Sequence, residues 1–355
     1  MAVSKAPGPW HEPEHLLSPR PRHAGVALAF GAAVTVGKLV PDKARLSIAC
    51  ALGGSLAFSI NDITVKSFSA TLPLHEVVLF RALVALVFTV TFFAPGKTVA
   101  EVFRTRRLSS HMFRGACVVV SNLTYFTALA ALPLAETSAI FFIAPLLITA
   151  LSALVLREHV GPWRWWALVL GMAGVLLIVR PGSVTFQWAV LLPALSALAY
   201  AGMHIMTRKM GLAESAATMA VYIQLNFIAV CLAMGLMFGS GQLAGSGDPS
   251  LEFMFRAWAW LGPRDLVFFL VAGACSATGG FLISQAYRSS AAALVAPFEY
   301  SALVLAAFWG FAIWGEIPGY LSALGILLIL SSGVVVAVRE AWSRRSPGLR
   351  AEVKS

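Results

Sequence analysis

Glu299 is the residue whose type and position most directly suggest chemistry in this sequence. It lies inside an apolar stretch, AAALVAPFEYSALVLAAFWGFAIWGE, which runs from Ala291 to Glu316. Such a stretch is long enough to cross a membrane, because a spanning helix needs about 20 apolar residues. A carboxylate inside the bilayer costs roughly 2.5–3.5 kcal/mol on insertion scales, so Glu299 should face a partner or a wet cavity. Pro297 removes a backbone donor nearby and loosens the helix.

Two interpretations of Glu299 stay open. In the first, its carboxylate binds a cationic or hydrogen-bonding group of a substrate, or takes up a proton that couples transport to a gradient. In the second, it is a buried structural acid that is bonded to another helix. Both interpretations require Glu299 to point into the protein and not toward lipid.

Arg81 is the basic candidate, in an apolar run that also holds His75 and Glu76. Glu76 is poorly spaced for a direct helical pair, so Arg81 should reach Glu299 or Asp62 across the bundle, or bind an anionic group. Further side chains inside apolar runs could line the same cavity, or could merely join helices by hydrogen bonds and packing. They are Asn122, Tyr125, Tyr200, His204, Gln224, Gln285 and Trp309.

Asp62 and Lys66 are four residues apart with the acid first, which is the favourable order for a salt bridge on a helix. Both lie near the end of the first apolar run, so they form either a rim salt bridge or a gate. Glu158 and Glu316 close later runs near water. We expect them to support loops and cap helices, and we leave them out of the substrate site.

The sequence lacks the motifs for ATP hydrolysis and for metal binding. There is no GxxxxGK[ST] loop for direct use of ATP and no HExxH metal motif. The cysteines Cys50, Cys117, Cys231 and Cys275 fall in apolar runs without CxxC spacing, which argues against a zinc site. We therefore expect no metal, no cofactor and no enzymatic activity. A polytopic enzyme that modifies lipids is the alternative from a different class.

Composition places most of the chain in lipid. Hydrophobic residues make up 59% and charged residues only 12%, whereas soluble domains carry about 25% charged residues. The net charge of +10 would suit nucleic acid, but the basic residues cluster in short segments between apolar runs. Charges in those positions orient a membrane protein, so nucleic-acid binding is not expected.

Ten apolar runs follow a polar, proline-rich start. A membrane-spanning helix hydrogen-bonds its own backbone N–H and C=O groups, for which lipid offers no partners. The expected fold is therefore an all-α polytopic membrane protein with ten transmembrane helices. The expected spans are 46–66, 75–94, 112–131, 134–156, 163–180, 186–207, 218–238, 264–287, 291–314 and 320–338. Residues 1–45 form an N-terminal extension that is mostly disordered, and residues 339–355 form a basic tail.

The distribution of basic residues orients these helices. If the N-terminus is cytoplasmic, most Lys and Arg residues fall on cytoplasmic segments, which include the C-terminal tail. The opposite segments then hold only Lys66, Arg180, Arg256 and Arg264. This asymmetry predicts that both termini are cytoplasmic.

The runs repeat after the fifth. LAFSINDITVK at 56–66 aligns with LAYAGMHIMTR at 198–208, and this alignment sets Asp62 opposite His204. Because five is odd, the half 184–338 inserts upside down relative to the half 46–183. Inverted repeats place a binding site at mid-membrane between the halves and work by alternating access. Chance alignment of apolar segments is the alternative.

The two halves, the Arg157-Glu158 and Gly315-Glu316 pairs that close the fourth and ninth runs, and APFEYSAL in the ninth resemble the drug/metabolite transporter superfamily, EamA type. The resemblance covers residues 46–338. It implies a ten-helix, inverted-repeat carrier with a central cavity. The segments PLHEVVLFRALVAL and APFEYSAL are similar to those of bacterial members that carry cofactors or vitamins.

These observations predict a secondary transporter that moves a small organic metabolite across the bacterial inner membrane. The solute we favour is vitamin- or cofactor-like, resembling riboflavin or S-adenosylmethionine. An amino-acid or drug exporter of the same superfamily is the alternative. The expected partners are the small-molecule substrate and the lipid bilayer, and proton coupling and a homodimer are left open.

Overall fold

A computed structural model describes residues 42–93, 98–157, 161–182, 187–210, 216–289, 295 and 298–345. Apart from Asp42, the helices described below belong to one unit of the chain, which begins at Lys43. Almost all of the predicted extension and the end of the predicted basic tail lie outside the described residues. Every regular element within the described ranges is helical, which confirms the all-α prediction there.

The helices follow the predicted apolar runs. They are α2 (Asp42–Phe68), α3 (Leu74–Phe92), α5 (Leu108–Ala131), α6 (Leu134–Phe141), α7 (Ala144–Val155), α8 (Pro162–Val179), α9 (Leu192–Met210), α10 (Ala216–Phe238), α12 (Pro263–Ser289), α14 (Ser301–Trp314) and α15 (Tyr320–Arg345). Short elements are α4 (Val99–Phe103), η1 (Trp188–Leu191) and α11 (Pro249–Phe255).

Eight segments in the described ranges are long and apolar enough to cross a membrane, with 134–155 counted as one. Two shorter apolar helices, Ser301–Trp314 and Tyr320–Val336, fall on the ninth and tenth predicted runs. The chain is therefore a multi-pass membrane protein by length and composition, and the count of ten spans stays a prediction.

The fourth run is broken, which the sequence reading did not anticipate. Helix α6 ends at Phe141 and α7 begins at Ala144, with Pro145 in its first turn. Proline cannot donate a backbone hydrogen bond and clashes with the carbonyl one turn earlier, so the chain turns before it. Helix α14 likewise begins only at Ser301, after Tyr300. The rings of Phe142 and Tyr300, beside the two helix ends, lie 5.2 Å apart.

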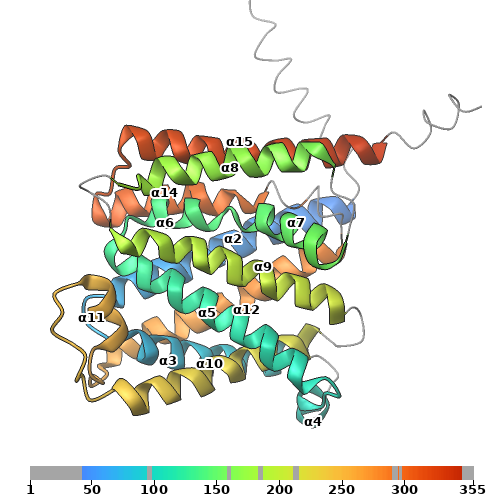
Figure 1. The fold of residues 1–355 in the computed structure, drawn as a ribbon. Helices are drawn as coiled ribbons and strands as arrows, with labels where there is room; N and C mark the ends of the chain where they lie inside the picture. The colour runs from blue at the N-terminus through green and yellow to red at the C-terminus, as the bar shows by residue number, and fades with distance from the viewer. Residues whose placement is uncertain are drawn as a thin grey trace, which may run out of the picture. The chain divides into compact units, whose positions relative to one another are not determined.

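Helices pack in pairs that join the two predicted halves. Helix α8 lies along α15, α3 along α10, and α6 against α14 (Figure 1). At the first of these contacts, a Cβ added to Gly174 would lie 2.7 Å from the carbonyl oxygen of Gly325. Only glycine allows two helix backbones to approach this closely.

One end of the bundle, which we call the Lys66 end, is where α2, α5, α8, α10 and α14 stop. The connector between α10 and α12 packs there. Arg256 Nη1 donates to the carbonyl oxygens of Ser69 and Leu72, both at 3.1 Å. The backbone N–H of Ala259 donates to Glu76 at 3.1 Å. The connector is therefore bonded directly to the residues at the end of α2 and the start of α3.

Candidate functional site

Arg81 is a buried cation at the centre of a polar group built on α2, α3 and α5. Its side chain is only 3% exposed. Nη2 donates to Asn122 Oδ1 at 3.1 Å and Nη1 donates to Asn61 Oδ1 at 3.4 Å. The guanidinium also lies over the rings of Phe126 and Phe227, with its carbon 5.3 Å and 5.1 Å from their centroids. Burial of a charge is tolerable only with such partners.

Asp62 faces the same interior and is the acid of this group. It accepts hydrogen bonds from Asn61 Nδ2 and from the Tyr125 hydroxyl, both at 3.1 Å. Tyr125 also shares a 2.9 Å hydrogen bond with Ser138 Oγ on α6. Asp62 lies within electrostatic range of Arg81, and Asn61 bridges the two side chains. The prediction that Arg81 reaches Asp62 across the bundle is thus met through a bridging amide.

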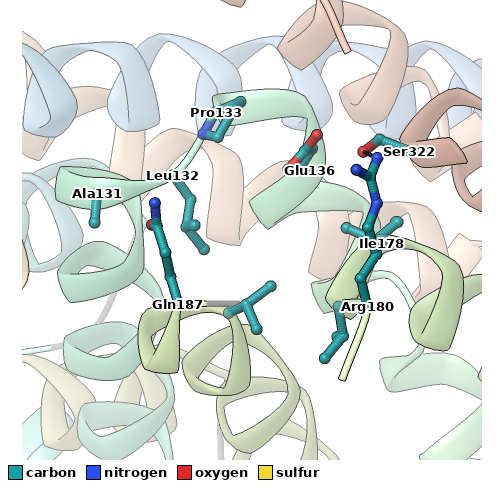
Figure 2. A pocket seen from close by; sticks show the side chains of 10 residues that line it. Ala131, Leu132, Pro133, Glu136, Ile178, Arg180, Gln187 and Ser322 are labelled. Atoms are coloured by element: carbon teal, nitrogen blue, oxygen red, sulfur yellow. Dashed lines mark hydrogen bonds between the residues drawn. The ribbon is translucent and has the colours of Figure 1, made fainter. Parts of the chain in front are cut away.

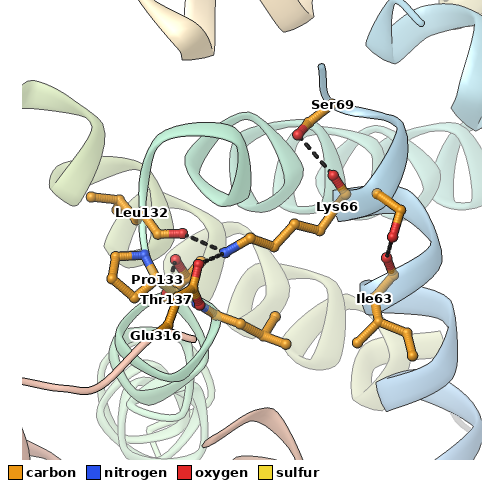
Figure 3. Close-up of polar contacts among 9 residues, drawn as sticks. Ile63, Lys66, Ser69, Leu132, Pro133, Thr137 and Glu316 are labelled. Atoms are coloured by element: carbon orange, nitrogen blue, oxygen red, sulfur yellow. Dashed lines mark hydrogen bonds and ion pairs between the residues drawn. The ribbon is translucent and has the colours of Figure 1, made fainter. Parts of the chain in front are cut away.

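The expected salt bridge between Asp62 and Lys66 is wrong. Lys66 Nζ forms an ion pair with Glu316 and donates to the carbonyl oxygen of Leu132 at 2.9 Å (Figure 3). Correct spacing on one helix did not decide the partner, because Asp62 accepts from two neutral donors, Asn61 beside it on α2 and Tyr125 of α5. Lys66 is itself 8% exposed and needs a partner that keeps its charge paired.

Glu316 joins three elements at the Lys66 end. One carboxylate oxygen pairs with Lys66 of α2, and the other accepts from the backbone N–H of Leu134, the first residue of α6, at 2.8 Å. Lys66 Nζ also lies 4.9 Å from the ring centroid of Trp314 in α14. A carboxylate at a helix N-terminus satisfies an unpaired backbone donor. The expected capping role of Glu316 is confirmed; that of Glu158 lies outside the described residues.

Glu299 belongs to a second group, at the break before α14. Its side chain is half-buried, and its backbone carbonyl lies 3.5 Å from Ser55 Oγ of α2. Tyr200 and Tyr300 both lie within electrostatic range of its carboxylate. The Tyr200 ring packs on His204 with centroids 4.6 Å apart, and His204 Nε2 is buried without a hydrogen-bond partner. Glu299 is therefore near polar side chains, and its role in binding or proton coupling stays a prediction.

Phe141 connects the two groups. Its ring lies 5.3 Å from that of Tyr125 on one side and 5.3 Å from that of Tyr200 on the other. Phe141 is the last residue of α6, so the connection occurs where the fourth run breaks. The structure thus gathers predicted residues from both halves around this break. They are Arg81, Asn122, Tyr125, Tyr200, His204 and Glu299.

The remaining candidates are less closely tied. Gln224 is buried on α10 and Gln285 is half-buried on α12. Trp309 of α14 packs on the apolar core and contacts Phe308, and its Nε1 is buried without a hydrogen-bond partner. Neither Gln224 nor Trp309 is hydrogen-bonded to Arg81 or Glu299 in the described ranges, so their assignment to the site stays a prediction.

Sequence reasoning missed Arg114 as an interior cation. Its Nε donates to Thr207 Oγ1 at 2.7 Å and its Nη1 to the Met219 carbonyl at 3.0 Å. It lies within electrostatic range of Tyr200 and His204. Because Arg114 stands near the start of its run, it was counted among the loop charges that orient the protein. Its position inside the apolar run was the available signal.

Two cavities open at the Lys66 end. The first, the Arg180 cavity, has a volume of about 190 Å³ (Figure 2). It is lined by Ala131, Leu132, Pro133, Glu136, Ile178, Val179, Arg180, Gln187, Val190 and Ser322. The second, of about 360 Å³, is lined by Lys66, Ser69, Trp314 and Glu316 with residues 129–133. In the part of the chain that the structure describes, no cluster of three His, Cys, Asp or Glu residues could hold a metal.

Comparison with known proteins bears out the resemblance to EamA-type carriers of the drug/metabolite transporter superfamily. Residues 45–180 match the EamA-like transporter family. The chain is 26% identical over 300 residues to the pseudopaline exporter of Pseudomonas aeruginosa, covering 84% of this chain and 98% of that one.

Two further relatives are named for transport of riboflavin and for uptake of S-adenosylmethionine. The riboflavin transporter of Vibrio cholerae is 28% identical over 300 residues, with 83% of this chain and 94% of the relative covered. The S-adenosylmethionine uptake transporter of Rickettsia prowazekii is 24% identical over 294 residues, with coverage of 81% and 91%. A solved crystal structure with 18% identity shares the fold at a TM-score of 0.58, over 85% of this chain and 99% of that one.

Proposed function

We propose that this chain, whose first half matches the EamA-like family, is a secondary carrier that moves a small organic metabolite across a bacterial inner membrane by alternating access. The observation that carries the proposal is the polar interior around the α6 break. Arg81 and Asp62 bring charges into candidate membrane spans, and Glu299 stands two residues before the apolar helix Ser301–Trp314. Charges at such depths are costly and mark substrate or proton paths.

The arrangement of helices supports an inverted repeat. The contacts α3–α10, α6–α14 and α8–α15 each join helices at equivalent places in the proposed halves 46–183 and 184–338. The breaks before α7 and before α14 also fall at equivalent places. Pro145, the second residue of α7, stands twelve residues before Arg157, and Ala302, the second residue of α14, stands thirteen residues before Gly315. Broken helices at a repeat interface are a common way for carriers to build a central site.

The solute we favour is vitamin- or cofactor-like. The named relatives for riboflavin and S-adenosylmethionine support this class, as do the aromatic side chains of Tyr125, Tyr200 and Phe141 beside the charged groups. Aromatic rings with a few fixed polar groups suit a planar, polar ligand. The pseudopaline exporter, a relative named for export, supports the direction of the second candidate, an amino-acid or drug exporter of the same superfamily.

Coupling and orientation complete the proposal. Glu299 is the proposed proton-coupling residue, because it lies at a helix break with Tyr200 and Tyr300 within electrostatic range of its carboxylate. Ser55 of the first half reaches the backbone carbonyl of the same residue. Both termini are placed in the cytoplasm, which makes the Lys66 end periplasmic. A homodimer is not required by this mechanism, since one chain supplies both halves.

Reconstitution tests the proposal. Purified protein in proteoliposomes should give saturable flux of at least one solute among riboflavin, S-adenosylmethionine and a panel of amino acids, driven by an imposed gradient of solute or protons. Empty liposomes and the exposed-residue variant Arg264→Gln serve as controls, and the variant should transport normally. Absence of flux for the whole panel, from protein that is folded and correctly inserted, would contradict the proposal.

A further inference from the structure

The Arg180 cavity is lined by one cation and one anion that do not pair with each other. Arg180 Nη2 donates to Ser322 Oγ over a long 3.4 Å, and Nε is buried without a hydrogen-bond partner among the described residues. Glu136 forms no hydrogen bond or ion pair with its side chain in the described ranges. A guanidinium has five N–H donors, so most of the bonding capacity of Arg180 is unused.

Separate elements hold these two charges in place. Arg180 ends α8 in the left-handed conformation, with φ 47° and ψ 59°, and its N–H still bonds to the Leu176 carbonyl. Glycine is the usual residue at such a helix end, so a side chain is retained here against a conformational preference. Glu136 lies in the first turn of α6, whose N-terminus is fixed by Glu316. Figure 2 shows Arg180 extending to Ser322, with Glu136 on the neighbouring helix.

The cavity is the size of a functional group and not of a cofactor. Pockets that enclose a drug-sized ligand hold roughly 300–1,000 Å³, whereas this one holds about 190 Å³. Gln187 and Ser322 add neutral polar groups to its wall. A ligand that fits must therefore be small, or must insert one end, and it must satisfy both signs of charge.

We propose that the Arg180 cavity binds a zwitterionic group, with its acid oxygens on Arg180 and its ammonium on Glu136. Guanidinium matches the planar oxygens of a carboxylate or phosphate, and a carboxylate accepts hydrogen bonds from an ammonium. This chemistry has two sources, a free amino acid or similar solute and the head group of phosphatidylethanolamine. The binding of a zwitterionic group at this cavity does not depend on the proposed carrier function. That a transported solute binds here before it enters the interior does rest on that function.

Saturation-transfer NMR on the purified full-length protein in detergent tests the proposal. The probes are glycine, β-alanine and γ-aminobutyrate, which differ in charge separation, together with glycerophosphoethanolamine for the lipid source. At least one probe should bind, and Arg180→Gln and Glu136→Gln should each weaken it at least fivefold. Arg264→Gln, an exposed arginine at the same end, should leave the affinity unchanged. Thermal unfolding of each variant checks that it is folded.

The pattern of binding decides the outcome. Sensitivity of an amino-acid probe to both variants supports a solute site, and the same sensitivity for glycerophosphoethanolamine alone supports the zwitterion site with a lipid source. Acetate serves as a further probe that carries the acid group alone. If acetate binds as tightly as the amino acids and Glu136→Gln has no effect, the proposal is overturned in favour of an anion site. No binding of any probe, or binding indifferent to Arg180→Gln, also overturns it. Binding without flux in proteoliposomes would contradict the carrier function alone.

Discussion

The positive charge of Arg81 is not paired directly with a carboxylate in the described ranges, because amide side chains accept its hydrogen bonds. Asn61 and Asn122 accept its hydrogen bonds, and Asp62, an acid within its electrostatic range, is bonded to Asn61. Neutral acceptors take one hydrogen bond each from Nη1 and Nη2, and Nε is buried without a hydrogen-bond partner in the described ranges. No carboxylate is fixed against the guanidinium, so we expect an acidic group of a substrate to bind there. In a direct ion pair, by contrast, a carboxylate of the protein would occupy the donors of Arg81 that a ligand needs.

Arg81→Lys tests this arrangement. Lysine keeps the charge but cannot hold Asn61 and Asn122 with a planar fork, so transport should fall at least tenfold through a higher KM. The melting temperature should change little, because one charge-assisted hydrogen bond remains. Arg81→Ala should instead destabilise the protein by about 3 kcal/mol or more, since it leaves Asp62 buried without its cation. Flux assays and thermal unfolding measure the two effects; equal loss of stability in both variants would indicate a purely structural arginine.

Glu299 and Asp62 are two interior acids, and a proton-coupling role belongs to whichever changes its protonation during transport. Glu299→Gln keeps hydrogen bonding but cannot ionise. We expect it to abolish accumulation driven by a pH gradient while retaining counterflow exchange, which needs no net proton movement. Measuring both activities in the same proteoliposomes separates coupling from binding. If pH-driven accumulation persists in Glu299→Gln and disappears in Asp62→Asn, the coupling residue is Asp62.

At the scale of the elements, the ion pair of Lys66 and Glu316 ties α2 to the start of α6 and the end of α14. Removing one partner leaves the other charge unpaired and largely buried, so Lys66→Met should destabilise the protein by about 3 kcal/mol. The double variant Lys66→Met with Glu316→Gln should recover much of that loss. Lys209→Met, at an exposed lysine, is the control and should be neutral. Thermal unfolding in detergent measures the cycle, and additive effects would show that the pair is not coupled.

The N-terminus of α11 should respond to acid. Partial burial opposes ionisation of Asp248, but hydrogen bonds from Trp188 Nε1 and from the N–H groups of Leu251 and Ser250 lower the pKa of this carboxyl. A folded-state pKa below the unfolded value means that its stabilisation is complete above about pH 4 to 5 and lost as the pH falls through the folded value.

We therefore expect the difference in melting temperature between the native protein and Asp248→Asn to shrink as the pH is lowered from 6 to 3. Asparagine also caps helices, so the difference at pH 6 should itself be small, and Asp248→Ala should cost about 1 kcal/mol. A pH-independent difference would show that Asp248 does not act through its charge.

For the whole molecule, sequence reasoning predicted correctly the features that a lipid environment imposes on the backbone. Open backbone is not tolerated in a bilayer, so apolar runs predicted helices and their approximate ends. The break at Phe142 and Ile143 was missed because an apolar run looks the same whether its helix is continuous or not, and Pro145 alone did not decide it. Partner choice was also missed. Asp62 and Lys66 are correctly spaced for each other, yet tertiary packing offers each a different partner.

Alternating access requires that the Lys66 end open, and this can be tested by preventing it. Lys66→Cys with Glu316→Cys replaces the ion pair by two neutral thiols, in a background where Cys50, Cys117, Cys231 and Cys275 are serine or alanine. The protein should transport before cross-linking, because both charges are removed together. A reducible bifunctional thiosulfonate should then block flux, and a reductant should restore it. Two controls carry one thiol each without leaving a charge unpaired, namely Lys66→Cys with Glu316→Gln and Lys66→Met with Glu316→Cys. Treated in the same way, both should stay active. Undiminished flux through fully cross-linked protein would mean that α2 and the end of α14 never separate, and that the solute must leave the interior by another route.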